Sequence, residues 1–187
     1  MKNKYMHTGF TLAELLAVVI IVAILSSLSL GYYKRSVEQA RFSEGLSLAG
    51  TLVEALNQAY WEDVREGAAN ATKKRKIATL DFALPNTSAC STPSDYCIKT
   101  PHFELQIDEE NNKAFVKAYR GASTSSRYYI QVRPVFGSDV SASDRDQIAC
   151  VGIGTSGKTF CESLGYTRCA IGEAASCSAC ESGVCIK

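Results

Sequence analysis

The sequence contains few of the residues on which catalysis and metal binding usually depend. Only two of its 187 residues are histidines, and one of them is His7, close to the N-terminus. It has no phosphate-binding glycine loop, no His/Glu set with metal-ligand spacing and no nucleophile elbow. Gly152–Gly157 imitates a dinucleotide-binding signature, but no βαβ pattern surrounds it. We therefore expect that the protein is not an enzyme and has no cofactor and no metal site.

An excess of charge of one sign is also absent. Twenty basic residues balance nineteen acidic ones, so the bulk charge gives no reason to bind nucleic acid or an acidic polymer. One local basic run, Lys73–Lys76, could contact DNA phosphates, but such runs are more often solvated loops. A nucleic-acid partner therefore stays a less favoured hypothesis.

The longest stretch without charge is Phe10–Leu30, which contains a single ionisable side chain, Glu14. Its twenty-one residues would form a helix of about 31 Å at about 1.5 Å per residue, which matches the hydrocarbon core of a membrane. An ionised Glu14 at the centre of a bilayer would cost about 2.5 to 3.5 kcal/mol, and less near an interface. The carboxylate therefore needs a partner.

An amine is the expected partner of Glu14. Cleavage after Gly9 would create a new amino terminus at Phe10, about one helical turn from Glu14. A neighbouring copy displaced along the helix axis could then present its terminal amine to this carboxylate. On this hypothesis the function of the chain depends on assembly with other copies of itself.

The segment Gly9-Phe10-Thr11-Leu12-Ala13-Glu14, preceded by Lys2 and Lys4, resembles the N-terminus of the type IV pilin superfamily. Prepilins of that family carry a short basic leader, a glycine before the cleavage site, an aromatic first mature residue, Thr-Leu and a glutamate as fifth mature residue. The resemblance implies cleavage by prepilin peptidase after Gly9, N-methylation of Phe10 and pairing of Glu14 with an adjacent subunit. Two residues depart from the pattern: Ala13, where isoleucine is usual, and Gly31, where many pilins have proline.

The resemblance implies a structural subunit of a type IV pilus, a fibre that serves adhesion and motility. The precursor would cross the inner membrane once, with its N-terminus in the cytoplasm, and the pilus assembly machinery would polymerise it into an extracellular filament. A pseudopilin of a type II secretion or DNA-uptake machine is the alternative within the family. Outside it, the chain could be a single-pass anchored protein with a disulfide-rich binding head, and a secretory signal peptide is the least favoured interpretation because its apolar region would be too long.

The helical pattern continues beyond the apolar stretch. We expect a cleaved leader at 1–9, a transmembrane or filament-core helix at 10–30 and an amphipathic continuation at 31–66. Gly45 and Gly50 would be either soft points or close-packing sites. The apolar stripe of the continuation consists of Phe42, Leu46, Ala49, Val53, Leu56, Tyr60 and Val64.

Beyond the helix the period of the pattern changes to two. We expect a loop region at 67–102, an antiparallel sheet at 103–160 and a cysteine-rich tail at 161–187. The sheet would lie on the helical stripe and bury Trp61 at its edge, which gives an α+β fold. The expected strands are 103–107, 114–119, 128–133 and one around 147–153.

All eight cysteines follow Thr87, which in a head outside the cytoplasm indicates disulfides. Proximity along the chain favours Cys90 with Cys97 and Cys150 with Cys161, the second pair around a glycine-rich, hairpin-like segment at 151–157. The last four cysteines allow three pairings, of which 169–177 with 180–185 is weakly preferred. A zinc or redox role for the CxxC sequence at 177–180 is less favoured than a structural disulfide. These last four residues are Cys169, Cys177, Cys180 and Cys185.

Overall fold

The structure is a computed structural model that describes residues 11–67, 74–84, 86–110, 113–134, 136, 148–169 and 184–186. The chain divides into two compact units, Met1–Ala40 and Arg41–Lys187, which we call the first and second units. Helix α1 (Leu12–Arg65) contributes its beginning to the first unit and its end to the second.

Helix α1 is continuous over 54 residues, close to the expected span. It passes through Gly31 without a break, because a glycine weakens a helix but removes no hydrogen bond. At its other end Gly67 adopts a φ of 75°, and its N–H donates to the carbonyl of Val64 at 3.2 Å. A glycine in this left-handed conformation is a common helix terminator, because it lacks the Cβ that would make the conformation costly.

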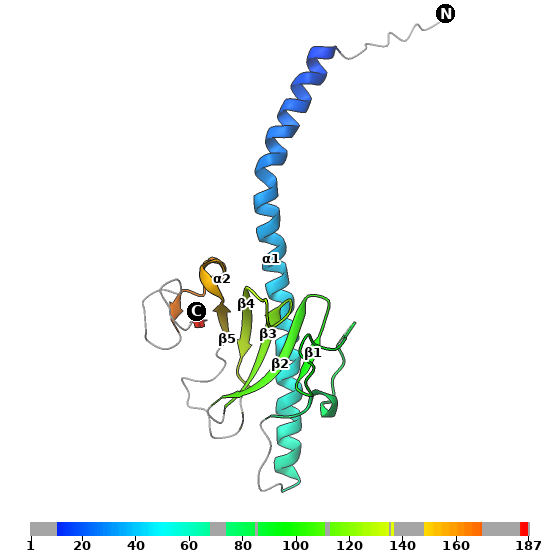
Figure 1. Cartoon of the computed structure of the whole chain (residues 1–187), viewed down its shortest axis with the longest axis vertical. Helices are drawn as coiled ribbons and strands as arrows, with labels where there is room; N and C mark the ends of the chain where they lie inside the picture. Colours follow the sequence, from blue (N-terminus) through cyan, green and yellow to red (C-terminus); the bar gives the residue numbers. More distant parts are fainter. Residues whose placement is uncertain are drawn as a thin grey trace, which may run out of the picture. The chain divides into compact units, whose positions relative to one another are not determined.

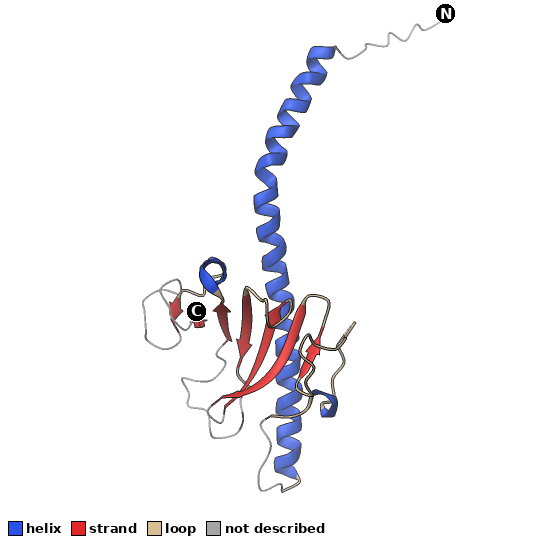
Figure 2. Cartoon of the chain, in the orientation of Figure 1, coloured by secondary structure: helices blue, strands red, loops and turns tan. Residues whose placement is uncertain are grey.

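The second unit contains a seven-stranded antiparallel sheet among the residues that the structure describes, in the order β1-β2-β3-β4-β5-β7-β6 (Figures 1 and 2). A 3-10 turn, η1, precedes the sheet, and helix α2 follows β5. The bounds are η1 Ile77–Thr79, β1 Cys97–Lys99, β2 Phe103–Glu110, β3 Lys113–Arg120, β4 Tyr128–Val132, β5 Ile148–Gly152, α2 Gly154–Ser163, β6 Arg168–Cys169 and β7 Val184–Ile186.

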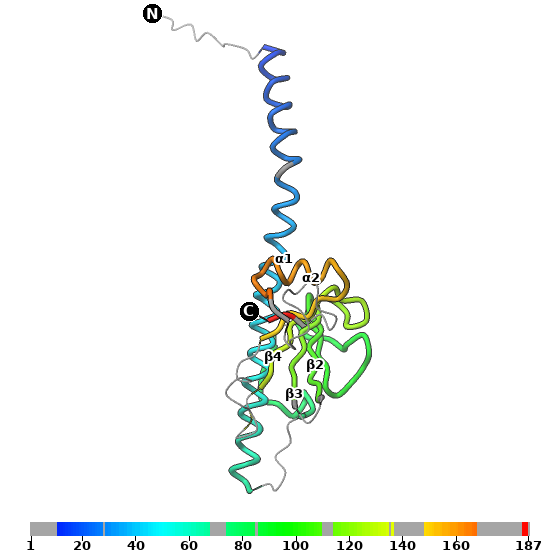
Figure 3. The backbone as a smooth tube through the Cα atoms, turned by 90° about the vertical axis from the view of Figure 1, so that its left-hand side faces the viewer, coloured from blue at the N-terminus to red at the C-terminus, as the bar shows by residue number. Residues whose placement is uncertain are grey.

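Buried side chains from one face of this sheet and from the part of α1 that belongs to the second unit form the hydrophobic core. Figure 3 shows this part of α1 running beside the sheet. Strand register places Leu105, Ala118, Ile130 and Cys150 in one row across β2 to β5, and all four are buried. Alternation within each strand presents such a row to one face, because successive side chains point to opposite sides. The α1 side chains buried in the core are Phe42, Ala49, Leu52, Ala55, Leu56 and Ala59.

Gly45 brings α1 close to the sheet. A methyl group at this position would lie 2.5 Å from Cε1 of Phe103 and 3.0 Å from Cδ1 of Ile130, so only glycine fits without movement. Gly50, by contrast, has nothing within 4 Å of the same position. The sequence allowed both glycines to be either soft points or close-packing sites. Of the two, only Gly45 is a close-packing site.

The α+β class, the long helix and the antiparallel sheet are confirmed. Three details are wrong. The region 67–102 is not only loop, because it contains η1 and the edge strand β1. Trp61 is 49% exposed rather than buried, and it packs edge-on against Tyr60. The segment 151–157 forms no hairpin: it ends β5 and begins α2.

The glycines of that segment allow α2 to lie tightly against β4 and β5. A Cβ at Gly157 would collide with the carbonyl oxygen of Arg127, and a Cβ at Gly152 would collide with the backbone of Lys158. Gly154 has a φ of 65°, which glycine adopts without strain. Close backbone approach explains this glycine spacing, and the described strands nearby pair only antiparallel, so they form no βαβ unit.

Candidate functional site

The most unusual surface among the described residues is the apolar beginning of α1. Residues 11–36 are exposed wherever their side chains are described, although most of them are aliphatic or aromatic. A monomeric soluble protein rarely presents so large a contiguous apolar surface, so this segment is the candidate site for contact with a membrane or another protein. Its large exposed side chains are Leu12, Leu15, Leu16, Val18, Val19, Ile20, Ile21, Val22, Ile24, Leu25, Leu30, Tyr32 and Tyr33.

Helix α1 is the one helix in the described part of the chain that is long and apolar enough to cross a membrane. Length and composition support this property, and both were expected from the sequence. The exposed aliphatic side chains occupy consecutive positions, so they cover every face of the helix rather than one stripe.

Glu14 belongs to a hydrogen-bonded box at the start of α1. Its Oε2 accepts hydrogen bonds from the backbone N–H of Thr11 at 2.9 Å and from the Thr11 hydroxyl at 2.8 Å. In return, the Thr11 Oγ1 accepts a hydrogen bond from the Glu14 N–H at 3.3 Å. This is a capping box, in which side chains satisfy N–H groups that the first turn leaves without helical partners.

The capping box leaves one oxygen of Glu14 open. Both hydrogen bonds from Thr11 reach Oε2, and no other described residue contacts this carboxylate by a hydrogen bond or an ion pair. The Thr-x-x-Glu spacing could have revealed the box from the sequence. The two other residues expected at this site, Gly9 and Phe10, lie outside the described residues.

The two disulfides expected from chain proximity are confirmed. Cys90 is bonded to Cys97 and Cys150 to Cys161, with Cα atoms 6.1 and 5.7 Å apart. Cys185 in β7 also forms a disulfide. Cys169 ends β6, while Cys177 and Cys180 lie outside the described residues, so the CxxC hypothesis concerns a segment that the structure does not describe.

A buried carboxylate lies beside the first disulfide. Glu104, on β2, has an exposed fraction of 0% and accepts hydrogen bonds from Ser123 Oγ at 2.8 Å, Gln106 Nε2 at 3.0 Å and the Ser91 N–H at 3.3 Å. Burial opposes ionisation, but these hydrogen bonds outweigh it, so the pKa of Glu104 lies below its ordinary value of 4.5.

The sulfur atoms of this disulfide and an oxygen of Glu104 lie within 4.8 Å of one another, a spacing that could suit a metal ion. A metal would need thiolate ligands, and both sulfurs are instead joined to each other. The cluster is therefore a crosslink beside an acid in this structure. It ties the segment before β1 to β2.

Three residues of the basic run after α1, at 74–76, are engaged within their own chain, while Lys73 lies outside the described residues. Arg75 pairs with Asp63, and the ammonium of Lys76 lies 2.7 Å from a carboxylate oxygen of Asp95. The ammonium of Lys74 lies 4.4 Å from the centre of the Tyr96 ring. These contacts favour the structural interpretation of the run over phosphate binding.

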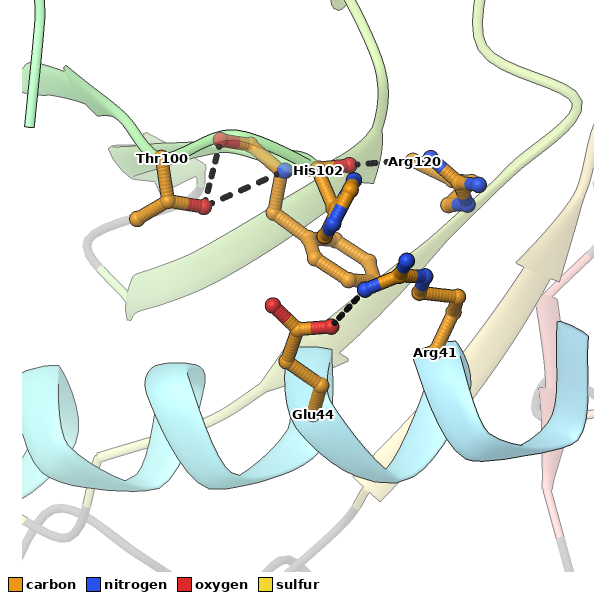
Figure 4. A network of polar contacts seen from close by, with 6 residues as sticks. Arg41, Glu44, Thr100, His102 and Arg120 are labelled. Atoms are coloured by element: carbon orange, nitrogen blue, oxygen red, sulfur yellow. Dashed lines mark hydrogen bonds and ion pairs between the residues drawn. The ribbon is translucent and has the colours of Figure 1, made fainter. Parts of the chain in front are cut away.

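The second histidine takes part in a polar network at the start of β2 (Figure 4). Arg120 donates a hydrogen bond to the backbone carbonyl of His102 at 3.2 Å. The Thr100 hydroxyl donates to the carbonyl of Phe103 at 3.1 Å and accepts from its N–H at 3.2 Å. These bonds fix the chain reversal that precedes β2, next to an ion pair on α1.

Comparisons with protein-family models, curated proteins and solved structures found no match to this chain. The structural class of the chain is therefore described from its own fold and its exposed helix. The chain is an α+β protein with at least two disulfides in its second unit and an N-terminal helix that is long and apolar enough to span a membrane.

Proposed function

We propose that this chain is a structural subunit of a type IV pilus, processed after Gly9 and polymerised through the beginning of α1. The observation that carries the proposal is the exposed apolar segment of α1 with Glu14 in its first turn. In the precursor this segment would lie in the inner membrane. In the filament it would exchange lipid for the same segment of neighbouring copies, so association would depend on close packing and on the few polar contacts.

The geometry of Glu14 supports a charge-based role in assembly. Oε2 is held by Thr11, which fixes the carboxylate at the N-terminal end of the helix, and Oε1 accepts no hydrogen bond from the described residues. Capping alone does not require a charge, because glutamine can also accept the hydrogen bond at this position of a capping box. In an apolar segment an ionised glutamate costs more free energy than a neutral glutamine. Its presence therefore favours a cationic partner, such as the amine of a neighbouring Phe10.

Variants of the capping box separate these two roles. Glu14→Ala should leave membrane insertion intact and abolish or strongly reduce filaments. Glu14→Gln keeps a hydrogen-bond acceptor for Thr11 but loses the charge, and it should fail in the same way. Thr11→Val is the matched control, because it removes the hydroxyl but keeps the carboxylate, and it should retain most filaments.

Filaments sheared from cells and seen by electron microscopy provide the measurement, with membrane fractionation as the control for insertion. Normal filaments from Glu14→Gln would refute the proposed charge pair. The mass of the mature N-terminus tests the assignment itself, since processing should give a methylated Phe10. A chain that keeps Met1 and stays monomeric in detergent would instead be a membrane-anchored binding protein.

A pseudopilin of a secretion or DNA-uptake machine would share the processing and the role of Glu14. Subunit abundance and filament length distinguish the two functions, because a pilus subunit forms long, abundant fibres. Replacement of Gly9 by a bulkier residue should block cleavage in both cases, which is visible as the loss of the lighter mature band.

A further inference from the structure

The Cys90–Cys97 disulfide closes directly against the carboxylate of Glu104. Oε1 of Glu104 lies 3.7 Å from Sγ of Cys97, and Cys97 has no thiol proton to donate because it is bonded to Cys90. The carboxylate is completely buried, while Cys97 itself is only partly buried. A reagent that reaches this disulfide from solvent therefore meets a buried acid immediately behind it.

The donors around Glu104 stabilise its charge without cancelling it. Ser91, Gln106 and Ser123 are all neutral, and no cationic side chain among the described residues forms an ion pair with Glu104. Hydrogen bonds from neutral groups favour the ionised form but leave a net negative charge in place. In a buried site such a charge is weakly screened, so it acts strongly on any second charge nearby.

We propose that Glu104 protects the Cys90–Cys97 disulfide from reduction by thiols. In that reaction a thiolate RS⁻ forms a bond to one cysteine sulfur, the Cys90–Cys97 bond breaks, and its electron pair leaves on the other sulfur, which takes up a proton from water. A second thiolate then attacks the R sulfur of the mixed disulfide. It releases RSSR and the second cysteine thiolate, which is also protonated.

Either direction of attack is opposed by Glu104. If the reagent attacks Cys90, the leaving thiolate forms on Cys97, in contact with the carboxylate. If it attacks Cys97, the incoming anion must approach the same carboxylate. Like charges repel, and a thiol whose thiolate is destabilised is also a slower leaving group.

The Cys150–Cys161 disulfide offers an internal comparison. Cys150 and Cys161 both have exposed fractions of 0%, so burial shields that bond from reagents. The Cys90–Cys97 bond has less steric cover, because Cys97 is partly exposed, and we infer that charge supplies the missing protection. This protection does not depend on filament assembly and would serve any role of the second unit outside the cytoplasm.

The test measures the reduction rate of each disulfide in the full chain. The oxidised protein in detergent is treated with dithiothreitol at neutral pH, free thiols are trapped by alkylation at timed intervals, and peptide mass spectrometry follows each disulfide separately. Glu104→Gln, which keeps the shape but removes the charge, should accelerate reduction of Cys90–Cys97 by about tenfold or more. The rate of Cys150–Cys161 should stay unchanged.

Ser123→Ala is the matched control, because it deletes one hydrogen bond to Glu104 but retains the carboxylate charge. Its Cys90–Cys97 rate should stay within about twofold of the parent protein if charge is the cause. Three results would overturn the proposal: equal rates in Glu104→Gln and the parent, equal acceleration of both disulfides, or the same acceleration in Ser123→Ala. The last two would show that loosened packing, rather than lost charge, exposes the bond.

Discussion

Alanine at Gly45 and alanine at Gly50 should change the stability of the second unit in opposite directions. Both glycines lie inside α1, where alanine favours the helix by about 1 kcal/mol at each position. The surroundings differ. The new methyl group at Gly45 would lie 2.5 and 2.6 Å from Cε1 and Cζ of Phe103, whereas at Gly50 it would meet no atom within 4 Å.

The magnitude follows from the constraint on Phe103. This side chain is completely buried at the start of β2, and Cδ1 of Ile130 also lies 3.0 Å from the new methyl, so the ring has little room to move. Overpacking of this kind typically costs about 1 to 3 kcal/mol. After the gain in helix propensity, Gly45→Ala should lose roughly 0 to 2 kcal/mol, and Gly50→Ala should gain up to about 1 kcal/mol.

The difference between the two variants is more informative than either value, because the propensity term cancels and only the overpacking term remains. Thermal unfolding of the full chain in detergent, with its disulfides intact and far-UV circular dichroism as the signal, measures this difference. At about 2 to 4 °C per kcal/mol, the melting temperatures should differ by roughly 2 to 12 °C. Equal increases in both variants would refute the close contact between α1 and Phe103.

Further predictions concern the second unit. Folding lowers the pKa of Glu104 from 4.5, so its stabilising contribution is present above about pH 4.5 and is lost as the pH falls through the folded-state pKa. In Glu104→Gln the free energy of unfolding should therefore fall less between neutral and acidic pH, which urea titrations can measure. Strand register places Cys169 opposite Cys185, so peptide mapping should find these two joined, rather than Cys180 with Cys185. Trp61, half exposed, should show red-shifted fluorescence and ready quenching by acrylamide; a blue-shifted, protected emission would restore the burial expected from the sequence.

Periodicity and local spacing made much of the fold predictable. The end of α1 and the strands β2 to β5 match the expected segments to within about three residues, because each has a clear helical or alternating pattern. The disulfides Cys90–Cys97 and Cys150–Cys161 were predictable for a different reason. Cysteines that are close in sequence lose little chain entropy when they pair.

The buried face of α1 was harder to predict, because small residues as well as large ones form it. The expected stripe followed bulky side chains such as Val53, Tyr60 and Val64, and Val64 is in fact 42% exposed. The sheet instead approaches Gly45 and a row of buried alanines, which hydropathy weighs lightly. This shift of the contact face explains why Trp61 is not buried.

The tail and the segment 151–157 depend on contacts between distant parts of the chain. Strands β6 and β7 are only two and three residues long, too short for a period, and they join the sheet through β5. The glycines at the start of α2 are explained by the backbone that approaches them, not by a turn of their own. Neither feature has a local signal that sequence patterns could detect.

The two parts of α1 differ in how their apolar residues are arranged, and this difference bears on the proposed assembly. In the second unit the buried side chains form one face, as expected for a helix that packs on a sheet. In the first unit, aliphatic residues occupy consecutive positions such as 18–22 and so surround the helix. A single protein face would leave much of that surface in water. Only an environment that encloses the helix, such as a lipid bilayer or a bundle of equivalent helices, can bury this surface. A subunit that moves from the bilayer into a bundle of its own copies keeps the surface buried before and after assembly.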